Sequence, residues 1–507
     1  MIAAAVETDP RTLATLCAGL TDEASIADAT VTDLALDSRR VTPGSGFIAL
    51  AGTRAHGLDF LDAALSARAG AVFFDANDPR WTMEVAERCR AARVPAIGIP
   101  ALARQVGTIA ARFWQEPSSA LDAVIAVTGT DGKTSVSHFV AAMLDEPDAP
   151  AAVLGTLGRG RIGQVTDAGL TTPDAVGVQA ALAELVGEGV CRLALEASSH
   201  GLAQYRLDGT RIDVAVLTQL GRDHLDYHAD ETAYAAAKAR LFAWPGLKAA
   251  VLNGDDRFGQ ALLGDLDPSV RAIVWGRTSG DLYARDVVAE PGGLRFELVV
   301  ADEAVPVSAP LLGGFNVDNL LAACGALVAL GHGPDEIARR IRQVRPVAGR
   351  MEAFRGSGHA TVVVDYAHNA GSLTAALGAL REHFSGRIWC VFGAGGDRDR
   401  GKRPLMAAAA AAGADRIVVT DDNPRHEDPD SIIAGILAGM PADQSVTVER
   451  DRERALALAL READPSDAIL LAGKGHESVQ IRGDEVLAWS DREAARRQLG
   501  LTDGEAP

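Results

Sequence analysis

Apolar runs alternate with helix-spaced apolar positions along most of this chain. Residues 123–127 form an unbroken apolar run, whereas Val136 and Phe139 begin a series of apolar residues at the spacing of one helix face. Gly129 and Gly132 interrupt the pattern between the two segments. We therefore predict a buried parallel strand, a glycine turn and the N-terminus of a helix.

The same alternation continues on both sides of this turn. The further elements are predicted, in chain order, as a helix at residues 101–114, an apolar strand with a polar end at 191–200, a second strand at 213–220, a helix at 231–242, antiparallel strands at 281–307 and a helix at 315–327. Strands that alternate with helices are typical of a mostly parallel sheet with crossover helices.

The length of 507 residues favours three domains, and we predict all three to be α/β. The N-terminal domain is predicted at residues 1–100, the central domain at 101–346 and the third domain at 347–507. The strands of the third domain are predicted at residues 361–364, 388–392, 416–419 and 468–471.

Composition and charge narrow the functional classes. Hydrophobic residues make up 48% of the chain, which is ample for several cores, and the net charge of −19 argues against a general nucleic-acid binder. The five scattered cysteines fit a reducing compartment and show no metal-ligand spacing. No secretory signal is apparent, and no apolar run is long enough to span a bilayer. We therefore expect a cytoplasmic protein with no nucleic-acid or membrane partner.

The glycine turn has the composition of a phosphate cradle. Its residues are Gly129, Thr130, Asp131, Gly132, Lys133, Thr134 and Ser135. Backbone N–H groups and the helix dipole favour an anion, a lysine neutralises phosphate charge, and a hydroxyl reaches Mg²⁺. Val127 stands where the full Walker spacing has a glycine, so the loop is a shortened form. The alternative is an ordinary turn between a strand and a helix.

Polar residues follow the next predicted strands at the same sheet edge. Glu196 ends one strand, His224 follows the next, and Lys238 lies in the predicted helix after it. Each alone is more often structural than catalytic, but open α/β sheets place ligands at this edge. Glu196 and Thr134 are then candidate Mg²⁺ ligands, because a hard cation prefers oxygen.

Four loops at one edge of the third sheet mix acidic, basic and glycine residues. They cover residues 365–368, 393–398, 421–425 and 473–477. Arginine pairs with carboxylates and acidic groups receive ammonium, so the loops suit a zwitterionic ligand. For residues 393–400 the alternative is a flexible turn with self-paired surface charges.

In the N-terminal domain, a turn at Ser38 and Arg39 could face a phosphate. Composition alone favours the other interpretation, a turn that a surface arginine holds together.

The ordered set of motifs resembles the Mur ligase family from about Leu36 to beyond Trp489. The matching sequences are Gly-Thr-Asp-Gly-Lys-Thr at residues 129–134, Glu-Ala-Ser-Ser-His-Gly-Leu at 196–202, Arg-Asp-His-Leu-Asp-Tyr-His at 222–228, Phe-Asn-Val-Asp-Asn at 315–319, Gly-Arg-Met-Glu at 349–352, Asp-Tyr-Ala-His at 365–368, Gly-Gly-Asp-Arg-Asp at 395–399 and Gly-Lys-Gly-His-Glu at 473–477.

The resemblance implies an N-terminal UDP-binding domain, a central P-loop ATPase domain and a C-terminal Rossmann-like domain that receives an amino acid. It implies ATP-dependent amide bond formation on UDP-N-acetylmuramoyl-L-alanyl-D-glutamate through an acyl phosphate, in peptidoglycan biosynthesis. Asp-Asn-Pro-Arg at residues 422–425 matches the family's recognition motif for meso-diaminopimelate, so this amino acid is expected rather than L-lysine. Two Mg²⁺ ions and a monomer are also expected, with ATP as co-substrate.

The resemblance implies site residues, position by position. Besides the loop at residues 129–135, ATP would contact Asn316, Asn319, Arg350 and Asp365. The UDP-muramoyl-dipeptide would contact Leu36, Ser38, Thr53, Arg54, Ala55, Thr171, Thr172, Ser198, Gln204 and Arg206. Diaminopimelate would contact Arg398, Asp422, Asn423, Pro424, Arg425, Gly473 and Glu477. The implied catalytic residues are Lys133, Glu196, His224 and Lys238, and the metal ligands are Thr134, Glu196, His224 and Lys238 as a carbamate.

The chain departs from the family pattern at several positions. Asp131 stands where asparagine is frequent, Gln219 replaces an asparagine, residues 369–371 replace Thr-Pro-Asp, and residues 53–54 replace His-Gln. These changes bear on nucleotide contacts. The competing interpretations are a folylpolyglutamate synthetase, a P-loop switch or motor without ligase activity, and a regulatory binding protein with an inactive ATPase.

Overall fold

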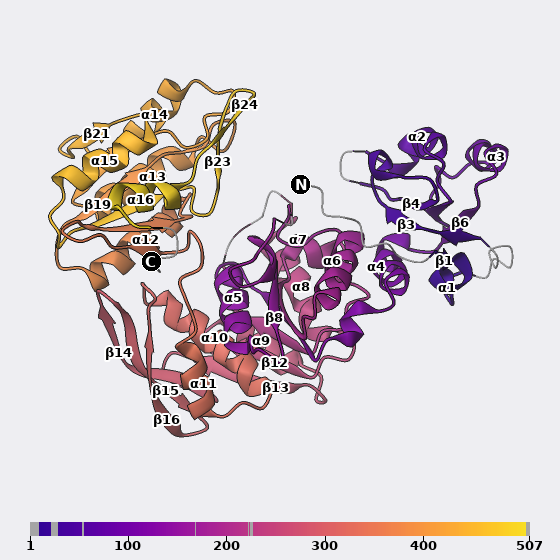
Figure 1. The fold of residues 1–507 in the computed structure, drawn as a ribbon, viewed down its shortest axis with the longest axis horizontal. Helices are drawn as coiled ribbons and strands as arrows, with labels where there is room; N and C mark the ends of the chain where they lie inside the picture. The colour runs from indigo at the N-terminus through magenta and orange to yellow at the C-terminus, as the bar shows by residue number, and fades with distance from the viewer. Residues whose placement is uncertain are drawn as a thin grey trace. The chain divides into compact units, whose positions relative to one another are not determined.

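The computed structural model describes residues 10–21, 29–52, 55–167, 169–221, 223 and 227–502 (Figure 1). Contacts divide the chain into two compact units, residues 1–274 with 325–331, and residues 275–324 with 332–507. The domain boundaries near residues 100 and 346 stay a prediction, because two units defined by contacts do not test a division into three domains.

A four-stranded parallel sheet begins the first unit, in the order β3-β4-β5-β6. Its strands are β3 (Asp33–Ala35), β4 (Ser45–Ala49), β5 (Ala71–Asp75) and β6 (Ala96–Ile99). The helices are α1 (Leu13–Cys17), α2 (Leu61–Ser66), α3 (Met83–Ala91) and α4 (Leu102–Phe113). One face of the sheet packs on α1 and α4, and the other packs on α2 and α3. Adjacent residues such as Phe47 and Ile48 are therefore both buried. A separate pair, β1 (Arg11–Thr12) and β2 (Thr30–Val31), is antiparallel.

A ten-stranded sheet has the order β16-β15-β14-β13-β12-β11-β7-β10-β8-β9. In the first unit its strands are β7 (Ala123–Thr128), β8 (Ala151–Gly155), β9 (Gly158–Arg161), β10 (Arg192–Glu196), β11 (Val214–Leu217) and β12 (Ala249–Asn253), and β13 (Arg271–Gly276) continues into the second unit. The helices here are α5 (Lys133–Leu144), α6 (Ala175–Gly187), α7 (Ser199–Ala203), α8 (Glu231–Ala239) and α9 (Arg257–Asp265).

Parallel pairing sets which residues meet at the edge of this sheet. Strand β7 lies between β10 and β11, with Glu196 opposite Val127 and Leu217 opposite Thr128. All six residues of β7 are buried, as expected for a central strand covered on both faces. The segments that follow the three strands therefore start side by side.

The second unit begins with the antiparallel strands β14 (Leu282–Glu290), β15 (Gly293–Val300) and β16 (Glu303–Ala309). Two helices follow, α10 (Phe315–Ala329), which ends in the first unit, and α11 (Pro334–Ile341).

The last sheet has the order β17-β18-β22-β19-β20-β21, coloured orange to yellow in Figure 1. Its strands are β17 (Glu352–Phe354), β18 (Thr361–Asp365), β19 (Ile388–Phe392), β20 (Arg416–Val419), β21 (Val446–Val448) and β22 (Ala468–Ala472). Helices α12 (Ala370–His383), α13 (Lys402–Gly413) and α14 (Pro429–Leu437) cover one face, and α15 (Arg452–Glu462) and α16 (Asp491–Leu499) cover the other. A hairpin of β23 (Val479–Arg482) and β24 (Glu485–Ala488) follows β22.

The predicted elements of the sheets are confirmed, with shifted ends. Strands β19 and β20 have the predicted bounds. The strand predicted at residues 213–220 is shorter and covers only β11 (Val214–Leu217). The helix predicted at residues 231–242 ends at Ala239 and continues as a 3-10 turn (Arg240–Ala243). The hairpin β23–β24 was not predicted, because all four residues of β24 are exposed and show no apolar alternation. Within the described ranges, no helix is long and apolar enough to cross a membrane.

Gly107 in α4 marks a close approach between two parts of the first unit. A Cβ atom at this position would overlap the backbone carbonyl of Asp208. We expect Gly107→Ala to lower the free energy of unfolding by about 1–3 kcal/mol, as overpacking against backbone does. Urea denaturation measures this change.

The matched control is Gly264→Ala in α9, where no atom lies within 4 Å of an added Cβ. This variant is expected to keep or gain up to about 1 kcal/mol, since alanine favours a helix. Equal free energies of unfolding for the two variants would contradict the close approach of Gly107 to the Asp208 carbonyl.

Candidate active site

The glycine loop at residues 129–132 joins β7 to α5 through backbone conformations that suit glycine. Gly129 and Gly132 have φ angles of +147° and +83°. The Thr130 N–H donates to the carbonyl of Gln219 (2.8 Å), and the Thr218 hydroxyl donates to the carbonyl of Asp131 (2.6 Å). Helix α5 begins at Lys133 without a side-chain cap, and the N-terminus of a helix favours an anion.

Two lysine side chains meet at this loop. The Lys133 Nζ donates to the carbonyls of Gly129 (2.9 Å) and Thr130 (2.8 Å). The Lys238 Nζ donates to the same Gly129 oxygen at 2.6 Å. Lys238 is 1% exposed and lies over the ring of Tyr234, whose hydroxyl is 3.0 Å from that of Thr130.

Burial, and next the charge of Lys133, lower the pKa of Lys238 to about 6. Lys238 is therefore a neutral amine at neutral pH, which is the form that reacts with CO₂ to give a carbamate. Burial also raises the pKa of Tyr234 to about 12, so this phenol stays protonated.

Glu196, at the end of β10, is a buried carboxylate surrounded by donors. It accepts hydrogen bonds from the Thr134 hydroxyl (3.1 Å), and from the Thr156 N–H (2.8 Å) and hydroxyl (3.0 Å). Burial raises the pKa of Glu196, and these donors and the charge of Lys133 oppose the rise. Thr156 was not predicted as a site residue, because a threonine after β8 belongs to none of the motifs.

The chemistry of this donor set fits a hard cation. A buried carboxylate and a hydroxyl 3.1 Å apart are the oxygen ligands that Mg²⁺ takes at a phosphate loop. In the part of the chain that the structure describes, no group of three or more His, Cys, Asp or Glu side chains forms a metal cluster. His224, which was predicted to complete a second metal site, lies outside the described residues.

Five of the residues predicted to contact the UDP-muramoyl-dipeptide form one network beside Glu196. Thr172 donates to the Glu196 carbonyl (2.7 Å), and Arg206 donates to the Thr172 carbonyl (2.7 Å). Arg206 also binds the amide oxygen of Gln204. The remaining members are Thr171, whose hydroxyl is 3.0 Å from that of Thr156, and Ser198, which caps α7.

The N-terminal candidates are only partly described. Leu36, Ser38 and Ala55 lie in the first unit, but Thr53 and Arg54 are outside the described residues. Arg39 is paired with the Asp37 carboxylate (2.6 Å) and its side chain is 86% exposed. This geometry agrees with the turn held together by a surface arginine.

The ATP candidates of the second unit form two local groups. The Asn319 amide nitrogen donates to the amide oxygen of Asn316 (2.9 Å), and the Asn316 amide nitrogen donates to the Leu312 carbonyl (2.7 Å). Burial raises the pKa of Asp365, and the charge of Arg350 opposes this rise. The Arg350 guanidinium lies over the ring of Tyr366.

The amino-acid candidates converge at the edge of the last sheet. Arg425 has a left-handed backbone (φ +53°) and donates to the Gly396 carbonyl at 2.9 Å. Gly473 has a φ angle of +115°, which residues with a side chain rarely adopt, so this loop favours glycine. Asn423 and Glu477 are joined by a hydrogen bond (2.9 Å). The other two candidates are Arg398, which is exposed, and Pro424, which is buried.

The hairpin β23–β24 supports this turn, although sequence analysis missed it. Gln480 donates to the Asp422 carbonyl (2.7 Å), and the Ile481 N–H donates to the Asn423 amide oxygen (3.0 Å). Backbone hydrogen bonds also join Arg425 to Ile481 and to Gly483. The hairpin thus holds the turn by hydrogen bonds to three of its residues.

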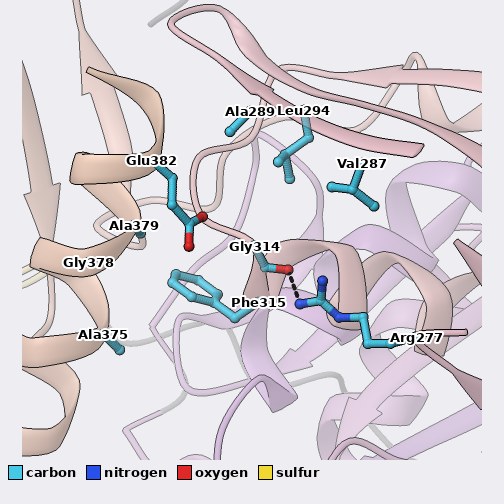
Figure 2. A pocket seen from close by; sticks show the side chains of 10 residues that line it. All are labelled: Arg277, Val287, Ala289, Leu294, Gly314, Phe315, Ala375, Gly378, Ala379 and Glu382. Atoms are coloured by element: carbon cyan, nitrogen blue, oxygen red, sulfur yellow. Dashed lines mark hydrogen bonds between the residues drawn. The ribbon is translucent and has the colours of Figure 1, made fainter. Parts of the chain in front are cut away.

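A cavity in the second unit is lined in part by Phe315, which directly precedes the ATP candidate Asn316. Its volume is about 600 Å³, and Figure 2 shows its lining residues. Val287, Ala289 and Leu294 from the β14–β15 hairpin face Phe315 of α10 and residues of α12. None of the predicted site residues lines the cavity.

Comparison with known proteins identifies the family to which this chain belongs. Three domain models match the chain: "Mur ligase family, catalytic domain" at residues 30–114, "Mur ligase middle domain" at 127–327 and "Mur ligase, glutamate ligase domain" at 349–475. A UDP-N-acetylmuramoyl-L-alanyl-D-glutamate–2,6-diaminopimelate ligase from Alkalilimnicola ehrlichii is 47% identical over 94% of this chain and 96% of its own length.

The chain belongs to the Mur ligase family. A ligase of the same name from Pseudomonas aeruginosa is 45% identical over 93% of this chain and 96% of its own. A solved structure, also titled as that ligase, has a TM-score of 0.72 at 33% identity and covers 97% of this chain and 99% of its own. The three-domain α/β fold class expected from the motifs is confirmed, and the alternative of a P-loop switch is wrong.

Two departures from the family pattern contact each other. The Gln219 amide donates to the Asp131 carboxylate at 3.4 Å. A third departure, Asn369, caps α12 by accepting from the Ser372 N–H (2.9 Å). These three departures therefore have local partners in this Mur ligase.

Thr156→Val tests how Glu196 is kept ionised. Losing the hydroxyl donor should raise the pKa of Glu196 further, so the carboxylate is protonated at a higher pH. We expect the Mg²⁺ concentration for half-maximal phosphate release to rise about tenfold near neutral pH, and the acid limb of the pH profile to move to higher pH.

Thr166→Val is the control, because this exposed threonine donates only to the Arg159 carbonyl nearby. Its Mg²⁺ dependence should match that of the unmodified enzyme. If the Mg²⁺ dependence of Thr156→Val were unchanged at every pH, the role of Thr156 in keeping Glu196 ionised would be contradicted.

Proposed function

We propose that this chain adds meso-2,6-diaminopimelate to UDP-N-acetylmuramoyl-L-alanyl-D-glutamate in peptidoglycan biosynthesis, as an ATP-dependent amide ligase. The observation that carries the proposal is the turn at residues 422–425, which presents Asp422 and Arg425 at the edge of the last sheet. A carboxylate and a guanidinium at one edge match the ammonium and the distal carboxylate of diaminopimelate. Relatives 43–47% identical over most of the chain carry the name of this reaction.

The chemical problem is that a carboxylate must attack the γ-phosphate of ATP, an anion approaching an anion. The first N–H groups of α5 and Lys133 supply positive charge at the loop. Lys133 would exchange its two loop carbonyls for phosphate oxygens when ATP binds. Thr134 and Glu196 would hold one Mg²⁺, and Glu196, His224 and carbamylated Lys238 would hold a second. The ions would neutralise the phosphates.

The reaction then has two bond exchanges. The dipeptide carboxylate forms a bond to the γ-phosphorus and ADP leaves, which gives an acyl phosphate. The amine of diaminopimelate attacks the acyl carbon, and phosphate leaves from the tetrahedral adduct. Arg398 and Arg425 would bind the carboxylates of the incoming amino acid, and Asp422 and Glu477 would accept its N–H groups.

The other assignments follow the same family pattern. Residues 1–100 would form the UDP-binding domain, 101–346 the ATPase domain and 347–507 the amino-acid domain. Asn316, Asn319, Arg350 and Asp365 would contact ATP. The residues that hold the muramoyl-dipeptide would be those of the Thr172–Arg206 network with Leu36, Ser38 and residues 53–55. We propose a cytoplasmic monomer.

Lys238 carbamylation predicts a dependence on CO₂. The amine has a pKa of about 6, so it is neutral and reactive above this pH and protonated below it. Removing CO₂ should lower turnover, and bicarbonate should restore it, faster above about pH 7 than below about pH 6. Lys238→Ala should be inactive in both conditions.

Lys248→Ala is the control, because this lysine is 69% exposed and paired with Asp213. It should respond to CO₂ as the unmodified enzyme does. Full turnover of Lys238→Ala would contradict carbamylation of Lys238. Turnover of the unmodified enzyme that does not depend on CO₂ would contradict it as well.

Phosphate release with the UDP-dipeptide, ATP and each amino acid tests the substrate. Diaminopimelate should support turnover and L-lysine very little, because a lysine would leave the Arg425 guanidinium without its carboxylate. Arg425→Ala should raise the KM for diaminopimelate on the order of 100-fold and leave the KM for ATP nearly unchanged.

Arg416→Ala, at the opposite end of β20 and exposed, should change neither constant. Equal turnover with L-lysine would overturn the specificity and leave the ligase standing. No phosphate release with any amino acid would instead support a binding protein with an inactive ATPase.

A further inference from the structure

Lys474 is a fully buried lysine at the amino-acid edge, with 0% of its surface exposed. It lies between Gly473 (φ +115°) and Gly475 (φ +52°). Left-handed glycines on both sides turn the chain so that the intervening side chain enters the domain. Family resemblance assigned roles to Gly473 and Glu477 but none to this lysine.

The ammonium of Lys474 contacts two candidate binding residues. Its Nζ donates to the amide oxygen of Asn423 (3.0 Å) and to Oε2 of Glu477 (3.0 Å). Asn423 closes the triangle, because its Nδ2 donates to the same Glu477 oxygen at 2.9 Å. Three side chains from two loops are thus fixed to one another.

The side-chain amide of Asn423 makes its hydrogen bonds to other protein groups. Its oxygen accepts from Lys474 and from the Ile481 N–H (3.0 Å), and the residue is 4% exposed. Glu477 differs, because its side chain is 30% exposed. Among the described residues its Oε1 has no hydrogen-bond partner, so this oxygen remains for a ligand.

We infer that Lys474 is a positioning residue of the amino-acid pocket: with Asn423 it holds Oε2 of Glu477, so that Oε1 accepts an N–H of the incoming amino acid. The inference rests on the proposed function. A glutamate has three rotatable side-chain bonds, and a carboxylate held at one oxygen loses little further freedom when a ligand binds at the other. The buried ammonium also needs this carboxylate, since a buried charge without a partner is strongly unfavourable.

The test varies diaminopimelate at saturating ATP and UDP-dipeptide. Lys474→Met keeps the chain length and removes the charge. We expect its KM for diaminopimelate to rise on the order of 10- to 100-fold while its KM for ATP stays within about twofold. If Lys474→Met unfolds at the assay temperature, Lys474→Gln makes the same test, because it also removes the charge and its amide can donate to Asn423.

A double-mutant cycle with Glu477→Gln separates positioning from simple loss of stability. If Lys474 acts through Glu477, the double variant should raise the KM for diaminopimelate no more than the larger single change. Arg387→Met is the control: it removes the partner (3.0 Å) of buried Asp467, before the start of β22, and should lower the melting temperature without changing this KM.

Additive effects on this KM, or an unchanged KM in Lys474→Met, would overturn the inference. Equal rises of the KM for ATP and for diaminopimelate would show a general structural role and would also overturn it. Ligation of diaminopimelate by the unmodified enzyme is measured before any variant. If the unmodified enzyme does not ligate it, the proposed function itself is overturned.

Discussion

One carbonyl oxygen, that of Gly129, accepts hydrogen bonds from both Lys133 and Lys238. Two ammonium groups cannot share a buried oxygen without a large electrostatic cost, and burial already disfavours the charge of Lys238. The result is one cation and one neutral amine at the same loop. The Lys133 cation can bind phosphate, and the neutral Lys238 amine can react with CO₂. The central site therefore depends on the two lysines having different charges.

The two chemical regions of this Mur ligase are built in the same way. In each, parallel strands end at one edge, glycines allow loops to approach closely, and side chains from neighbouring loops hold a carboxylate by hydrogen bonds. Glu196 is surrounded by threonine donors at the central sheet, and Glu477 is held by Lys474 at the last sheet. Rigid strands with short, cross-linked loops keep reacting groups in place more accurately than free loops could.

Three of the departures from the family pattern make hydrogen bonds close to the sites. Asp131 and Gln219 differ from the usual asparagines, and their side chains contact each other across the phosphate loop. Asn369, which stands where the family has a threonine, caps α12. The side chains at these three positions are therefore fixed by local partners.

The sequence by itself determined the strands, because β7, β19 and β22 are unbroken apolar runs, and it determined the glycine loop and the ordered motifs of the family. Only the tertiary structure decided how side chains far apart in the chain are paired. Thr156 beside Glu196 and Lys474 between Asn423 and Glu477 carry no periodic signal, because a hydrogen bond depends on positions in space. The same holds for the pKa of Lys238, which burial and a neighbouring lysine set together, and neither can be read from the order of residues.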